Sequence, residues 1–210
     1  MSDSEKLEQI LAHSSVLWKA GELAGKSIER IETGYAALNA ILPGQGWPVG
    51  GLMEFIMPAW GLGELALIMP LIKTLSRQSF WVIWIAPPHI PYAPHLLQAA
   101  VDLERVLVIS EQADETECLW AMEKLLRANA CGLVMAWPGK ISHQQMRRLQ
   151  LAAEAGRTLG IIFQMQEKKT SAAAFRLRLQ AIEHGVQVEV IKARGGSRHQ
   201  KADIYFTDKS

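Results

Sequence analysis

The chain has 210 residues, of which 49% are hydrophobic and 20% are charged, a composition typical of a globular domain and unlike that of a disordered chain. The formal net charge of +1 excludes a protein-wide basic field for nucleic acid or anionic membranes. Cys118 and Cys131 lack the spacing of a zinc site or a disulfide framework. Neither a basic leader nor a long apolar span is present, so we expect a cytoplasmic protein.

Residues 1–26 mix a short amphipathic stretch with Ser and Gly, which predicts an N-terminal helix or arm and a linker ahead of a domain at 27–210. A segment rich in Gly and Pro then leads into an apolar run that predicts a buried strand at 52–57. A helix is expected at 63–76, broken or kinked near Pro70.

Strands and helices continue to alternate after this point, with a Pro-rich loop, APPHIPYAP, after the second strand. Such alternation predicts an α/β fold with a parallel sheet covered on both faces. Ser142 and Gln145 predict the capped start of the last helix. Strands are expected at 80–86, 105–109, 132–137 and 159–165, and helices near 95–100, at 114–130 and after 142.

The last part of the chain has a different pattern, in which apolar residues alternate with charged ones, as in Phe175–Leu179. This pattern predicts antiparallel strands with one solvated face. Residues 168–210 carry nine basic and four acidic side chains, so this region is a candidate basic surface for nucleic acid or a protein partner, and a solvated sheet face is the alternative. The residues of this candidate surface are Lys168, Lys169, Arg176, Arg178, Arg194 and Arg198.

The segment from Met57 to Ala66, MPAWGLGELA, has the position of a phosphate-binding loop because it joins a predicted strand to a predicted helix. A working loop ends in Gly-Lys-Ser or Gly-Lys-Thr, where lysine reaches the phosphates and the hydroxyl holds magnesium. Here Glu64 follows Gly63, and like charges about 4 Å apart cost roughly 1 kcal/mol even in bulk water. We therefore interpret the loop as degenerate. Its residues are Met57, Pro58, Gly61, Gly63 and Glu64.

The segment at 31–59, IETGYAALNAILPGQGWPVGGLMEFIMPA, resembles the entry to the RecA ATPase core. The order of elements extends the resemblance over about residues 30–206. It implies a RecA-like P-loop NTPase core with a parallel central sheet, antiparallel C-terminal strands and a degenerate nucleotide site. Pro88 and Trp137 stand where this family has a catalytic Glu and an Asp beside magnesium. We therefore expect no enzyme activity, no catalytic residue, no cofactor and no metal.

Four phrases, GWPVG, WIAPPHIPYAP, AWP and RRLQLAAEAG, resemble the ImuA family. The resemblance implies a non-catalytic accessory protein of the bacterial SOS response that acts in error-prone translesion DNA synthesis. Its implied partners are an ImuB-like polymerase homologue and an error-prone C-family polymerase, with RecA as a further candidate. Direct DNA contact would fall to the basic residues named above.

The same broad family is similar to SulA, the SOS inhibitor that binds the tubulin-like division protein FtsZ and blocks septation. A SulA-like division inhibitor is therefore the alternative hypothesis. The RecA-like C-terminal part and the N-terminal arm favour ImuA. Binding to FtsZ or to an ImuB-like protein distinguishes the two hypotheses.

Overall fold

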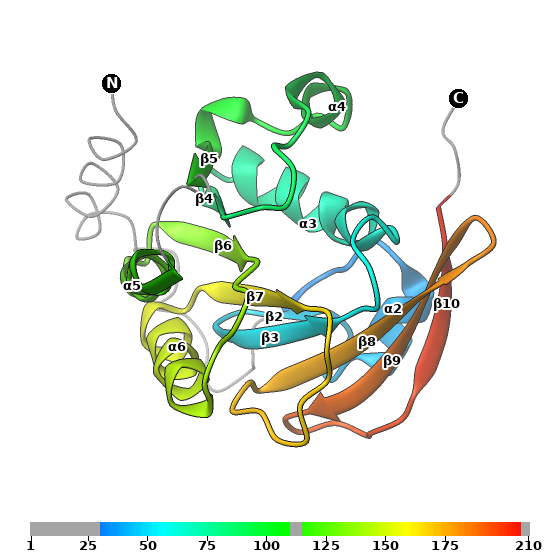
Figure 1. Cartoon of the computed structure of the whole chain (residues 1–210). Helices are drawn as coiled ribbons and strands as arrows, with labels where there is room; N and C mark the ends of the chain where they lie inside the picture. The colour runs from blue at the N-terminus through cyan, green and yellow to red at the C-terminus, as the bar shows by residue number, and fades with distance from the viewer. Residues whose placement is uncertain (1–29, 110–114, 207–210) are drawn as a thin grey trace, which may run out of the picture.

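The computed structural model describes residues 30–109 and 115–206, so the N-terminal arm expected at 1–26 lies outside the described residues. An eight-stranded sheet in the order β10-β9-β8-β3-β7-β6-β4-β5 forms the centre of the molecule (Figure 1). Its strands are β3 (Gly51–Ile56), β4 (Trp81–Ile85), β5 (Val106–Ile109), β6 (Cys131–Ala136), β7 (Leu159–Gln164), β8 (Phe175–Ile182), β9 (Gly185–Ala193) and β10 (Lys201–Tyr205).

A small antiparallel pair, β1 (Arg30–Ile31) and β2 (Trp47–Pro48), precedes this sheet. The strands expected between residues 52 and 165 correspond to β3–β7, and each boundary differs by at most one residue. The described helices are α2 (Ala36–Ile41), α3 (Glu64–Arg77), α4 (Ala93–Gln98), the 3-10 helix η1 (Leu103–Arg105), α5 (Glu115–Arg127) and α6 (His143–Gly156).

Helices cover both faces of the sheet, with α3 on one face and α5 and α6 on the other (Figure 1). Each face has its own apolar core. One core includes Leu67 and Leu71 of α3, and the other includes Met122 of α5 and Leu149 of α6. Gly156 lets α6 approach α5 closely, since a Cβ atom there would lie 1.9 Å from the carbonyl oxygen of Leu126.

The C-terminal strands differ from the expected antiparallel arrangement at β8. This strand pairs in parallel with β3 on one side and antiparallel with β9 on the other, while β9 and β10 are antiparallel. One face of β8 is buried, as expected, and the other is solvated only in part, since Arg178 is half-buried and Gln180 is exposed whereas Arg176 is buried. Arg176 is only 5% exposed.

Two local predictions have different outcomes. The capping box at the start of α6 is confirmed, because Ser142 Oγ accepts the Gln145 N–H while the Gln145 side chain accepts the Ser142 N–H. Of the break or kink expected near Pro70, the break is absent, since α3 runs through this residue. Proline cannot donate to the carbonyl four residues earlier, and the Tyr35 hydroxyl donates to that Ala66 oxygen instead, at 3.0 Å.

Candidate protein-binding surface

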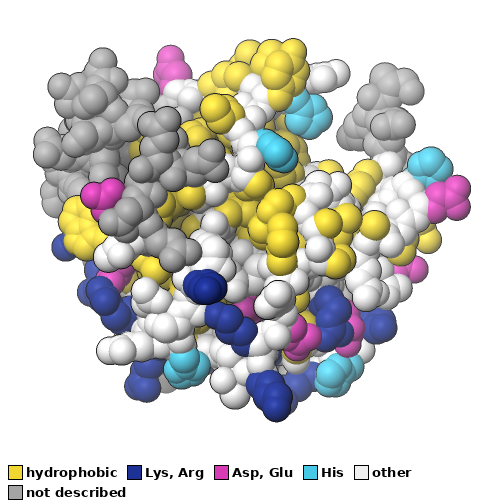
Figure 2. All heavy atoms as spheres, in the orientation of Figure 1, with side chains coloured by type: hydrophobic (Ala, Val, Ile, Leu, Met, Phe, Trp, Pro, Cys, Tyr) yellow, Lys and Arg dark blue, Asp and Glu magenta, His cyan; other side chains and the backbone are white. Residues whose placement is uncertain are grey.

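Three large apolar side chains lie exposed in α4 and in the connection that leads to it from β4. The exposed fractions are 84% for Ile90, 73% for Tyr92 and 58% for Leu97. Figure 2 shows hydrophobic side chains gathered over α4, at the top of this face. We call these three residues the α4 patch. An exposed apolar patch is typical of a protein-binding site, because a partner removes it from water.

The α4 patch is held by a short connection of restricted flexibility. Four prolines lie between residues 87 and 94, and each fixes its own φ angle. Leu96 is only 4% exposed and anchors α4 in the core beside Leu97. The Asp102 N–H donates to Ser76 Oγ at 3.1 Å, which ties the chain beyond α4 to α3. A patch held in this way loses little conformational entropy on binding.

Aromatic side chains gather where the parallel strands end. Trp137, directly after β6, lies between Trp84 and Phe163, with ring centroids 5.8 and 4.3 Å away. Trp60 and Trp137 are partly buried and pack against the core of this face. Met165, directly after β7, is 48% exposed. Because β4, β6 and β7 are neighbouring parallel strands, their carboxyl ends lie at the same edge of the sheet. Trp137 and Met165 therefore lie at the edge from which the connection to α4 also leaves.

The loop between β3 and α3 holds its own carboxylate. Glu64 is only 4% exposed, and its Oε1 accepts the Gly61 N–H at 2.9 Å. Phe206 lies against the loop, since a Cβ atom on Gly63 would come within 2.4 Å of that ring. The chain's own anion therefore lies at the N-terminus of α3, where a phosphate would have to bind. The other predicted loop residues are Met57, which is buried, and Pro58, which is exposed.

The prediction that Arg176 contributes to a basic surface is wrong. Its Nε donates to Glu54 Oε2 at 2.6 Å, and its Nη2 donates to the Lys168 carbonyl oxygen at 2.9 Å. Glu54 is completely buried in β3 and lies directly opposite Arg176 in the register with β8. The two residues form an ion pair inside the sheet, out of reach of a macromolecule.

Two further arginines of the predicted surface are paired with carboxylates. Arg178 lies between Glu167 and Glu189, at 2.5 and 2.6 Å, and its pKa is raised chiefly by the hydrogen bond to Glu167. Arg194 pairs with Glu154 at 2.6 Å. Each pair offsets part of the charge that a polyanion would otherwise meet, although Arg194 remains largely exposed.

The remaining predicted basic residues lie in two loops. Lys168 Nζ donates to the Ile141 carbonyl oxygen, whereas Lys169 and Arg198 are exposed. Within the described part of the chain, neither Lys169 nor Arg198 has a carboxylate within ion-pair distance. The structure therefore does not bring the six predicted residues together as one uniform cationic face.

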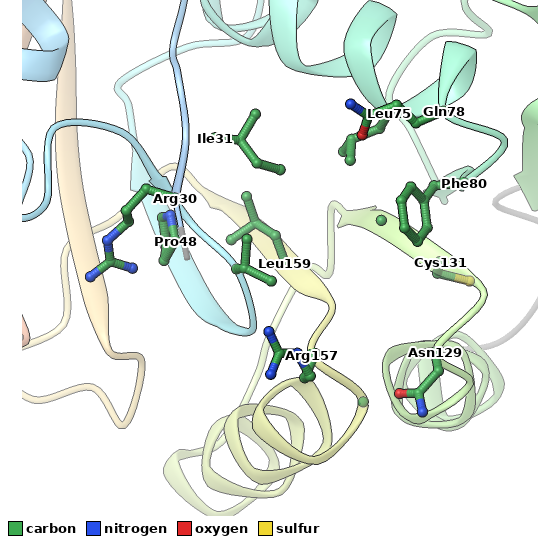
Figure 3. Close-up of a pocket in the computed structure, with 13 residues that line it drawn as sticks. Arg30, Ile31, Pro48, Leu75, Gln78, Phe80, Asn129, Cys131, Arg157 and Leu159 are labelled. Atoms are coloured by element: carbon green, nitrogen blue, oxygen red, sulfur yellow. The ribbon is translucent and has the colours of Figure 1, made fainter. Parts of the chain in front are cut away.

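A cavity of about 260 Å³ lies at the opposite edge of the sheet, where β6 and β7 begin. Figure 3 shows Ile31, Leu75 and Leu159 converging on it, with Cys131 and Phe80 at one side. Burial raises the pKa of the Cys131 thiol to about 12. The thiol is therefore protonated at neutral pH and a poor nucleophile.

We expect the Cys131 thiol to resist modification in the native protein. In a Cys118→Ala variant, which leaves a single cysteine, an aromatic disulfide reagent at about pH 8 should react only as fast as the protein unfolds, because Cys131 is buried and lacks thiolate character. In denaturant the same thiol should react at once. Prompt labelling of the folded protein would contradict this prediction.

The described part of the chain has neither a metal-binding cluster nor a membrane-spanning helix. Over residues 30–109 and 115–206, no three His, Cys, Asp or Glu side chains are grouped so that they could hold a metal ion. In the same residues, no helix combines the length and the apolar character needed to span a bilayer.

Comparison with known proteins points to the segment that contains the α4 patch. The family model described as "Cell division inhibitor SulA" matches residues 61–160. This segment is similar to SulA. It extends from the loop before α3 to the start of β7 and contains Ile90, Tyr92 and Leu97.

Individual relatives give the same name. SulA from Edwardsiella piscicida is 35% identical over 108 residues, which are 51% of this chain and 64% of that protein. SulA from Pectobacterium carotovorum is 30% identical over 112 residues, 53% of this chain and 65% of the relative. The aligned part thus spans just under two thirds of each of these relatives. The crystal structure of SulA from Pseudomonas aeruginosa aligns with a TM-score of 0.45 at 23% identity, over 54% of this chain and 98% of that one.

These matches correct two predictions. The assignment to the ImuA family, with its role in translesion synthesis and its polymerase partners, is wrong, because the matching family model and the relatives above are all SulA. The assignment to a RecA-like P-loop NTPase core is wrong for the same reason. The physical reason is that a strand, a glycine-containing loop and a helix in this order recur in many α/β folds, so the position of the loop did not identify the family.

Sequence reasoning did not identify the α4 patch as a candidate site. The available signal was the alternation of prolines with large apolar residues in APPHIPYAP, a stiff segment with few polar side chains. The 3.6-residue period does not reveal whether Leu96 or Leu97 points inward, because α4 has only six residues. The packing of α4 decides that Leu96 is buried and Leu97 is exposed.

Proposed function

We propose that this protein is a SulA-like inhibitor of cell division in the SOS response, which acts by binding FtsZ through the α4 patch. The proposal rests chiefly on the match of residues 61–160 to the family described as "Cell division inhibitor SulA". Inhibition by binding needs a surface that recognises a partner and does not need a catalytic group.

The geometry of the α4 patch supports a protein partner. Tyr92 combines a large apolar ring with a hydroxyl, and aromatic residues of this kind are enriched among the residues that dominate binding energy. Ile90 and Leu97 supply apolar area next to it and carry no charge that binding would have to desolvate. The Lys or Arg nearest to the α4 patch along the chain is Arg105, beyond α4. Its guanidinium lies over the ring of Trp81, 5.5 Å from the ring centroid.

The proposal is tested by binding and by the morphology of cells. Immobilised full-length protein is offered purified FtsZ, and retained FtsZ is measured against a column without bait. Expression of the protein in a rod-shaped bacterium should also produce long cells without septa, because FtsZ removed by binding cannot support division. If FtsZ is not retained and the cells divide normally at comparable expression, the protein is not a division inhibitor of this type.

A further inference from the structure

A second hollow lies away from the α4 patch, between α6, the connection from β7 to β8 and the loop from β9 to β10. Its volume is about 280 Å³, and its charged lining residues are Glu154, Lys192, Arg194 and Arg198. Three of these four are cations. Lys192, Arg194 and Arg198 lie outside the SulA-like segment at 61–160, so the similarity to SulA does not account for this hollow.

Lys192 is held in position at this hollow by the backbone. Its Nζ donates to the carbonyl oxygens of Ser171 and Ala173, at 3.0 and 2.7 Å. An ammonium group has three donors, so one N–H remains after these two bonds. Fixing the side chain in advance reduces the entropy that a ligand must overcome.

The charges in the hollow are not balanced by the protein. Glu154 is the single carboxylate among the lining residues, and it pairs with Arg194 at 2.6 Å. Arg198 has no carboxylate within ion-pair distance in residues 30–109 and 115–206. The pKa of the Lys192 ammonium is lowered first by burial and then by the charges of Arg176 and Arg198, with Glu54 acting in the opposite direction. A bound anion would relieve this crowding of cations.

Basic residues continue beyond the hollow. Arg147 is exposed on α6, one turn before the lining residue Gln150. Lys169 is exposed two residues before Ser171, whose carbonyl oxygen holds Lys192. Figure 2 shows Lys and Arg side chains gathered on the lower half of the face in view. Arg147 and Lys169 thus add exposed positive charge on the two elements that border the hollow.

We infer that the hollow lined by Lys192, Arg194 and Arg198 is a binding site for a phosphate group. Arginine guanidinium groups and a fixed ammonium match the oxygens of phosphate in charge and hydrogen-bond geometry. The phosphate belongs either to a free small molecule or to the backbone of single-stranded nucleic acid. In the second case, Arg147 and Lys169 would contact further phosphates of that backbone. Binding to a backbone depends on salt and not on base sequence.

The experiment uses the full-length protein and two probes, inorganic phosphate and a short fluorescent oligomer of deoxythymidine. Anisotropy reports oligomer binding between about 50 and 200 mM salt, and thermal unfolding reports stabilisation by phosphate. Arg198→Ala should weaken binding about tenfold and reduce the slope of log K against log salt by about 1. Glu154→Gln should tighten binding, because it removes the only carboxylate of the lining.

Lys73→Ala is the charge-matched control, since Lys73 is exposed on α3 and outside the hollow. It should leave binding of both probes unchanged. If the oligomer binds and inorganic phosphate competes with it only weakly, the ligand is a nucleic-acid backbone. If inorganic phosphate binds as tightly as the oligomer does for each phosphate group that it carries, the ligand is a small molecule. If neither probe binds at millimolar concentration, or if Arg198→Ala and Lys73→Ala behave alike, the inference is wrong.

Discussion

Replacing Glu54 by leucine is expected to lower the free energy of unfolding by about 3–5 kcal/mol. Arg176 would keep its guanidinium in an interior where it is only 5% exposed, without the carboxylate that accepts from its Nε at 2.6 Å. The Lys168 carbonyl oxygen would remain as a neutral acceptor, and Glu167 lies 3.9 Å away. Since globular domains are stable by about 5–15 kcal/mol, such a loss is readily measured by denaturant unfolding.

A double variant separates the ion pair from packing. Glu54→Leu combined with Arg176→Leu removes both charges, and apolar replacement of a buried pair is often neutral. The double variant should therefore be more stable than Glu54→Leu alone. A loss below about 1 kcal/mol in the single variant, or a double variant no more stable than the single one, would show that the pair contributes little.

Replacing Leu97 by aspartate should weaken FtsZ binding by at least about 30-fold, the equivalent of the roughly 2 kcal/mol that marks a dominant binding residue. The aspartate would carry a charge into a surface that the partner must desolvate. Leu97 is 58% exposed in the free protein, so the stability of the fold should change by no more than about 0.5 kcal/mol. Surface plasmon resonance with purified FtsZ measures the loss.

Leu151→Asp is a matched control for this substitution. Leu151 has a similar exposed fraction, 53%, but lies in α6, which covers the opposite face of the sheet from α3. It should leave FtsZ binding and the filamentation of cells unchanged. Equal effects of the two substitutions would place the interface elsewhere, even if the protein does bind FtsZ.

The positions of most elements could be predicted from the sequence because their signals are local. Apolar runs located β3–β7 to within one residue, and Ser142 with Gln145 marked the start of α6. Local signals failed where a distant residue intervenes. Pro70 does not break α3, because the hydroxyl of Tyr35, 31 residues before Ala66, donates to the Ala66 carbonyl oxygen that the proline leaves unpaired.

The candidate sites depended on contacts that no local pattern encodes. The alternation in β8 correctly placed Arg176 on the opposite face of the strand from its apolar neighbours. It could not indicate that β3 would bring Glu54, which is 122 residues earlier in the chain, directly opposite Arg176. Likewise, nine basic residues after position 167 are visible in the sequence. The sequence does not show that Arg176, Arg178 and Arg194 among them pair with carboxylates on other elements.

The sequence by itself determined the alternation of strands and helices and the excess of basic residues near the C-terminus, because composition and hydrophobic period are properties of neighbouring residues. Only the tertiary structure decided that Arg176 is buried with Glu54, that Lys192 and Arg198 share a hollow, and that Leu97 is exposed while Leu96 is not. The physical reason is that pairing of charges and exposure to water depend on which strands and helices pack together.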